Sequence, residues 1–159
     1  MLQDIRGFIA SGCVTGLSDF YRSPDELSNF ASGLLLAGAA CAIVTLWAVS
    51  DRAMCLLMLR FYRNLLSSPN LSPAQALRQA IHWLRTATRE ALTHFAHEYD
   101  IAKDDLWKID IRSDTLRGDF PAETQTVLSP PHIAHPPDLA AERPFARPIF
   151  WAATLLYGY

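Results

Sequence analysis

The order of elements that the sequence predicts is typical of an α/β domain with helices on the faces of a sheet. Hydrophobic patterning indicates a strand, a helix, a strand, two helices, an irregular stretch and a final strand. The first crossover has the length of a right-handed parallel βαβ unit. The chain has 159 residues, half of them apolar, which is enough for one buried core. We therefore expect three mostly parallel strands with flanking helices.

The predicted βαβ unit comes first in the chain. Residues 4–12 indicate a strand that ends in small residues. A helix should begin at Ser23, since a proline follows it and Glu26 lies three residues on, as in a capping box. The helix should end near Gly38. Residues 41–49 are uncharged and partly β-branched, which predicts a buried strand.

This unit contains a stretch long enough to suggest a membrane span. No charge occurs in the 24 residues between Glu26 and Asp51. A helix ending near Gly38 and a buried parallel strand after it explain the same apolarity without lipid. We favour that interpretation and predict no membrane partner.

Apolar side chains recur at steps of three and four residues in two further segments. Residues 51–66 are the first, and we predict a helix there. Ser72 and Pro73 then start another helix, whose apolar stripe continues to about Tyr99. Thr88 fills the one gap in this stripe, and its methyl group can still face a core.

The pattern fails after the second of these helices. Seven of the ten prolines lie between Pro121 and Pro148. We interpret residues 100–148 as an irregular, proline-rich insertion with one short ordered piece near 107–111. Residues 150–159 indicate the final strand.

Charge and cysteine content exclude several classes of protein. The net charge is −2, which predicts no nucleic-acid partner. The three cysteines, Cys13, Cys41 and Cys55, form no CxxC pair and no disulfide framework, so a reducing cytoplasm fits best. Cys41 and Cys55 lie on apolar faces and should be inert core thiols. We expect no cofactor.

Three neighbouring polar residues on the last predicted helix raise the question of a metal site. His94, His97 and Glu98 have no fourth ligand at convincing spacing. A solvated helix face explains them better, and we expect no metal.

Two residues follow the ends of the first two strands. Cys13 comes after the first, and Asp51 after the second. Since parallel neighbouring strands end at the same edge, we expect Cys13 and Asp51 to lie close together at the carboxyl edge of the sheet. Open α/β sheets hold their sites at that edge.

Three stretches of the chain carry patterns of a known family. FIASGCVTGLSDF, at 8–20, is similar to a strand followed by a nucleophile loop, and residues 32–66 surround a pattern close to S-L-W-x-V-x-D. Residues 72–85 and 147–158 are similar to an A-L-R-x-A helix and to a closing H-P-x-x-W-A strand. Together they resemble the CHAT domain of the caspase and separase group of cysteine peptidases.

This resemblance implies that residues 1–159 form the C-terminal portion of a partial caspase-like domain with α/β/α layers. It implies that Cys13 is the nucleophile, with Gly12 and Gly16 leaving the backbone free to approach a protein substrate. Val14 departs from the acidic or polar residue that is common in the family, and Arg147 from its histidine.

The histidine of the family lies well before the cysteine. Only twelve residues precede Cys13 here, and none is histidine. The five histidines all come later, at His82, His94, His97, His132 and His135. We therefore expect an incomplete Cys/His pair and no peptidase activity from this chain alone.

Asp51 has two interpretations. By resemblance to separases it would line a pocket for a basic residue before the cut. Alternatively, it only complements the positive end of its helix.

Two functions remain open. The chain is a fragment of an active peptidase that cleaves proteins, or an inactive CHAT-like module that binds a protein partner. In either case the strand before Cys13 would have one open side, which favours self-association through the sheet edge.

Overall fold

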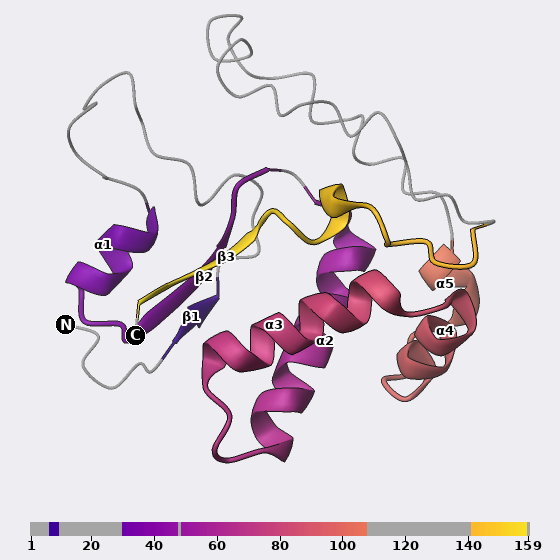
Figure 1. Cartoon of the computed structure of the whole chain (residues 1–159), viewed down its shortest axis with the longest axis horizontal. Helices are drawn as coiled ribbons and strands as arrows, with labels where there is room; N and C mark the ends of the chain where they lie inside the picture. Colours follow the sequence, from indigo (N-terminus) through magenta and orange to yellow (C-terminus); the bar gives the residue numbers. More distant parts are fainter. Residues whose placement is uncertain (1–6, 10–29, 48, 108–140, 159) are drawn as a thin grey trace, which may run out of the picture.

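The computed structural model of the chain is a three-stranded sheet with helices on both of its faces (Figure 1). The structure describes residues 7–9, 30–47, 49–107 and 141–158. This mixed α/β architecture agrees with the fold class that the sequence predicts.

The described elements follow the predicted order with three additions: a short helix, a 3-10 turn, and a second helix where one long helix is predicted. The strands are β1 (Phe8–Ile9), β2 (Cys41–Thr45) and β3 (Thr154–Gly158). The helices and the 3-10 turn are α1 (Phe30–Leu36), α2 (Asp51–Ser67), α3 (Pro73–Thr86), α4 (Arg89–His97), α5 (Lys103–Trp107) and η2 (Pro148–Phe150).

The sheet has β2 at its centre, between β1 and β3. β1 pairs with β2 in parallel, with Phe8 opposite Ala42, as the first crossover predicts. β3 pairs with β2 antiparallel, so the expectation of a mostly parallel sheet is wrong for this strand. The amide of Leu46, just past β2, donates to Ala153, just before β3. The chain therefore enters β3 at the carboxyl end of β2 and has to run back along it.

The two faces of the sheet support cores of very different size. All five residues of β2 are buried, as expected of a strand covered on both faces. Ile43 belongs to the large core that α2, α3, α4 and α5 build. Ala42 and Val44, which alternate with it, pack with Ala31 of α1 in a small core. Figure 1 shows α1 on one side of the sheet and the other helices on the opposite side.

Gly38 ends α1, as predicted. Its φ of 104° suits glycine, and its amide donates to Leu35 while the amide of Ala39 donates to Leu34. This pair of bonds is a Schellman motif. The uncharged stretch is thus a helix end, a turn and a strand. No helix in the described ranges is long and apolar enough to cross a membrane. The predicted helix start at Ser23 lies outside the described residues.

The helix predicted to run from Ser72 to about Tyr99 is two helices. Ser72 and Gln75 form the capping box that starts α3. The helix ends at Thr86, and the backbone of Ala87 is extended. The hydroxyl of Thr88 then accepts a hydrogen bond from the amide of Ala91. Thr88 is therefore the N-cap of α4, where its backbone is extended.

The stretch predicted to be irregular begins with α5. This helix ends at Trp107, the first residue of the ordered piece predicted at 107–111. Residues 108–140 lie outside the described part. The last predicted strand is shorter than expected, because η2 and a turn precede β3.

Candidate functional site

Of the residues that the sequence assigns to a site, the structure describes Asp51. Asp51 is the first residue of α2 and is exposed. Its carboxylate lies at the positive end of the helix dipole. The side chain of the preceding residue, Ser50, makes no capping hydrogen bond. Cys13, Gly12 and Gly16 lie outside the described residues.

The strand directions fix the edge of the sheet at which Asp51 lies. The chain leaves the carboxyl end of β2 at Thr45 and starts α2 six residues later. β1 runs in the same direction, with Ile9 opposite Ile43. Both strands therefore point to the edge at which Asp51 begins its helix. The position of Cys13 beside Asp51 stays a prediction.

A hydrogen bond between residues far apart in the sequence holds the connection from β2 to Asp51 in place. The indole nitrogen of Trp47 donates to the carbonyl oxygen of Ile149, in η2, over 3.1 Å. Trp47 is in the stretch that resembles S-L-W-x-V-x-D, and Ile149 is in the closing stretch. A signal in the sequence that points to such a bond is that a partly buried indole N–H needs an acceptor.

A shallow hollow of about 210 Å³ lies beside the start of α2. Its lining residues come from α2 and from the chain around α5, and they are Asp51, Arg52, Cys55, Leu56, Ile101 and Leu106. The carboxylate and the guanidinium oppose each other in charge, while the other side chains offer apolar contact. Almost all of the exposed lining is apolar, so the hollow offers chiefly apolar contact to a ligand.

The two cysteines of the described part differ from each other. Cys41 is buried, as expected of a core thiol. Cys55 is exposed, so the expectation that it belongs to the core is wrong. It lines the hollow at the start of α2, together with Leu56, Ile101 and Leu106. Desolvation by neighbouring atoms raises the pKa of both thiols, which disfavours the reactive thiolate.

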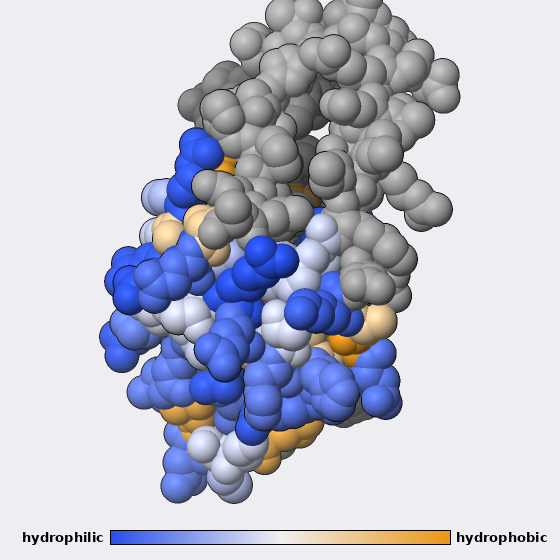
Figure 2. Space-filling model, turned by 90° about the vertical axis from the view of Figure 1, so that its right-hand side faces the viewer, coloured by the Kyte–Doolittle hydropathy of each residue, from blue (hydrophilic) through white to orange (hydrophobic). Residues whose placement is uncertain are grey.

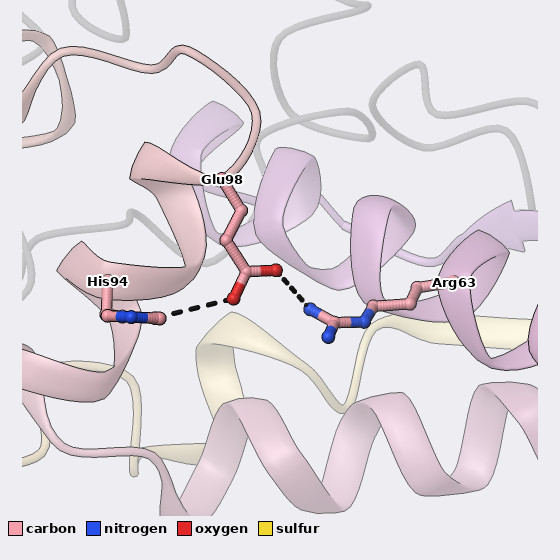
Figure 3. A network of polar contacts seen from close by, with 3 residues as sticks. All are labelled: Arg63, His94 and Glu98. Atoms are coloured by element: carbon pink, nitrogen blue, oxygen red, sulfur yellow. Dashed lines mark hydrogen bonds and ion pairs between the residues drawn. The ribbon is translucent and has the colours of Figure 1, made fainter.

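The histidines of α4 lie away from Asp51. Glu98 accepts a hydrogen bond from Arg63 over 2.5 Å, and His94 lies 3.4 Å from its other oxygen (Figure 3). His94 and His97 line a second hollow, of about 820 Å³, which Asp51 does not line. Within the described ranges, no three His, Cys, Asp or Glu residues gather closely enough to hold a metal ion.

A buried pair of threonines closes the carboxyl end of β2. Thr45 and Thr154 are cross-strand partners, exposed by 2% and 5% respectively. The hydroxyl oxygen of Thr154 has no hydrogen-bond partner. An unpaired buried hydroxyl is unfavourable.

The fold and the edge together define an α/β domain whose candidate site lies at the carboxyl ends of two parallel strands. The model of the CHAT domain family matches residues 2–159, so the chain belongs to the CHAT domain family, whose members are caspase-like, peptidase-related domains. The comparisons with curated proteins and with solved structures gave no match.

Proposed function

We propose that the chain carries the nucleophile side of a caspase-like cysteine peptidase site, within a partial α/β/α domain of three layers. Cys13 is the nucleophile in this proposal, and Asp51 contacts the substrate residue before the cut. The observation that carries the proposal is the parallel pairing of β1 with β2. It directs the chain after both strands toward one edge.

Chain length is compatible with this arrangement. Cys13 follows Ile9 by four residues. Four residues reach at most about 14 Å, which would keep Cys13 within that distance of Ile9. From there its thiolate would attack the scissile carbonyl carbon, and the C–N bond would break as the amine takes a proton. Backbone amides near Gly12 and Gly16 would hold the oxyanion.

No histidine of the described residues lines the hollow beside Asp51. His82 is exposed on α3, and His94 and His97 line the hollow beside α4. In our proposal a histidine from another polypeptide segment assists the proton transfer. The chain by itself then binds substrate without cleaving it. A reducing compartment such as the cytoplasm would keep Cys13 in its thiol form.

Asp51 supports a preference for basic substrates. Its carboxylate is exposed and forms no ion pair with any described residue. An Arg or Lys side chain of a peptide would supply the missing cation, with its methylenes against Ile101 and Leu106. Arg52 in the same hollow weakens this preference, since it repels a second cation.

The alternative function is that of an inactive module that binds another protein. The observation that favours it is the position of β1, which has a partner strand on one side only in the described part. Free N–H and C=O groups on such an edge can add a strand from a partner or from a second copy.

The test uses a thiol-reactive electrophile on a peptide that ends in Arg, with a Gln peptide of the same length as the control. We expect that the chain does not cleave the same two peptides when they carry no electrophile. Cys13 should be labelled faster by the Arg probe than by the Gln probe, and Asp51→Asn should remove the difference. Cys13→Ala should abolish the labelling.

Two results would contradict the proposal. Turnover that disappears in Cys13→Ala would show that the chain already holds its base. Equal labelling by the two probes would show that Asp51 does not select the substrate, which favours the binding module.

A further inference from the structure

The apolar residues that line the hollow beside Asp51 are held in place by the folded core. Leu56 of α2 and Leu106 of α5 are buried, with exposures of 0% and 3%, and both belong to the large core. Ile101, between α4 and α5, is half-buried and packs against the same core. The hollow is therefore formed before any ligand binds, as is usual for a binding site.

The end of α4 fixes the position of Ile101. The amide of Ile101 donates to the carbonyl oxygen of Ala96 over 3.1 Å, and the amide of Asp100 donates to that of His97 over 3.2 Å. These two bonds form a Schellman motif, in which Asp100 has the left-handed backbone, with a φ of 57°. Little conformational entropy is lost when a ligand packs against a residue that is held in this way.

The volume of the hollow suits one side chain better than a whole small molecule. The hollow encloses about 210 Å³. Pockets for drug-sized ligands have about 300–1,000 Å³. The fitting occupant is therefore a single side chain of a peptide substrate.

The two charged residues that line the hollow offset each other. Asp51 and Arg52 are neighbours at the start of α2, and neither forms an ion pair with another described residue. The exposed lining is otherwise chiefly apolar. An aliphatic side chain gives up no hydrogen bond on entering such a hollow, whereas an uncharged amide gives up its bonds to water.

Apolar surface is uncommon on the neighbouring side of the molecule. Helices α4 and α5 lie at the right of Figure 1, and Figure 2 views the molecule from that side. The surface in this view is mostly hydrophilic, with apolar areas in a few places. The apolar lining of the hollow is therefore a local feature and not a general property of the surface nearby.

We propose, on the basis of the function proposed above, that the hollow accepts an aliphatic residue before the cut as well as a basic one. A leucine side chain of the substrate would lie against Ile101 and Leu106 and leave Asp51 and Arg52 in contact with water. Its selection comes from the burial of apolar area and not from charge. The substrates of the complete site then include proteins with leucine before the cut.

The test adds two probes to the Arg and Gln pair. The thiol-reactive electrophile is placed on peptides that end in Leu or in Asn, whose side chains have nearly the same shape. Mass spectrometry of peptide fragments measures labelling at Cys13, because Cys55 also carries an exposed thiol. The Leu probe should label Cys13 about tenfold faster than the Asn probe. Asp51→Asn should leave this ratio unchanged.

Ile101→Thr and Ile81→Thr are a matched pair of variants. Both isoleucines are half-buried and pack against the large core, and Ile101 lines the hollow, whereas Ile81 lies on α3. Ile101→Thr should lower the ratio of Leu to Asn labelling to about threefold or less, and Ile81→Thr should not change it.

Cys55→Asp is a second variant of the lining, at an exposed position where folding tolerates a charge. It should slow labelling of Cys13 by the Leu probe and speed labelling by the Arg probe, because the added carboxylate attracts a cation.

The failure of this inference differs from the failure of the proposed function. If the Arg probe labels Cys13 faster than the Gln probe but the Leu and Asn probes are equal, the hollow takes no aliphatic residue, and the proposed function stands. A preference for Leu that survives both Ile101→Thr and Cys55→Asp shows that leucine binds elsewhere, which overturns the inference. If no probe labels Cys13, the proposed function is wrong as well.

Discussion

Trp47→Phe tests whether one hydrogen bond holds the carboxyl end of β2 to the 3-10 turn η2. The change removes the indole N–H that Trp47 donates to Ile149 and leaves that half-buried carbonyl without its donor. The lost bond is worth about 1 kcal/mol. The smaller ring also loses contact with the large core, which adds about 1 kcal/mol. We expect a total loss of about 2 kcal/mol in the free energy of unfolding.

Trp151→Phe is the matched control, because it also removes an indole bond to a backbone carbonyl. Trp151 donates to Ala146 over 3.3 Å in an exposed setting, and the guanidinium of Arg85 stacks over its ring. Water can replace an exposed bond, and exposed cation–π contacts contribute about 0.5–1 kcal/mol. Trp151 also packs against the large core, so its smaller ring costs about 1 kcal/mol there too, without the further cost of a part-buried hydrogen bond.

Urea unfolding of both variants and the parent, followed by circular dichroism, gives the two differences directly. The slopes with urea should stay equal, so the midpoints report stability alone. If Trp47→Phe destabilises the chain no more than Trp151→Phe does, the bond from Trp47 to Ile149 does not hold this edge together. The role assigned to Trp47 would then be wrong.

Two further predictions concern Thr154 and Cys55. Thr154→Val removes a buried hydroxyl that has no hydrogen-bond partner. The free energy of unfolding should therefore stay equal or rise by about 1 kcal/mol. A loss of more than about 1 kcal/mol, measured by urea unfolding, would contradict this prediction. Neighbouring atoms partly desolvate the exposed Cys55 thiol and raise its pKa, so in Cys13→Ser at pH 8 the folded chain should react with iodoacetamide more slowly at Cys55 than the urea-unfolded chain. Because the folded pKa is the higher one, the stability that Cys55 contributes is present below the unfolded pKa and is lost as pH rises through the folded pKa. Cys41 should react only on unfolding, and equal rates for Cys55 in both states would refute the shift.

Local signals in the sequence predicted several elements well. Gly38 ends α1 because its backbone needs a positive φ, and that preference is a property of one residue. Ser72 starts α3 because its hydroxyl and the side chain of Gln75 satisfy backbone amides three residues apart. The parallel pairing of β1 with β2 follows from the order of strand, helix and strand.

Periodicity failed where two helices share one core. Leu84 of α3 and Leu92 of α4 are both fully buried, so the apolar stripe passes across the break between them. Thr88 was placed in this stripe for its methyl group, but its hydroxyl determines the structure. Cys55 shows a related failure, because an apolar neighbourhood in the sequence does not say which side of a helix meets the core.

Contacts made by the closing stretch of the chain could not be predicted. Trp47 and Ile149 are 102 residues apart, and neither residue type indicates the other. The direction of β3 depends on where the chain enters the sheet, which the bond from Leu46 to Ala153 fixes. Of the candidate site, the position of Asp51 at the edge follows from the sequence, whereas Cys13 lies outside the described residues.

The unequal cores of the sheet imply that its two sides do not open together. Among the described residues on the α1 side, Ala31, Ala42 and Val44 are fully buried and Leu34, Leu155 and Tyr157 pack against them. Lifting this helix therefore exposes less apolar area than opening the large core does. Amide hydrogens of α1 should then exchange with solvent through small, frequent openings. Those of β2 are bonded to strands on both sides and should exchange only when the larger core comes apart. We therefore expect fast amide exchange in α1 and slow amide exchange in β2.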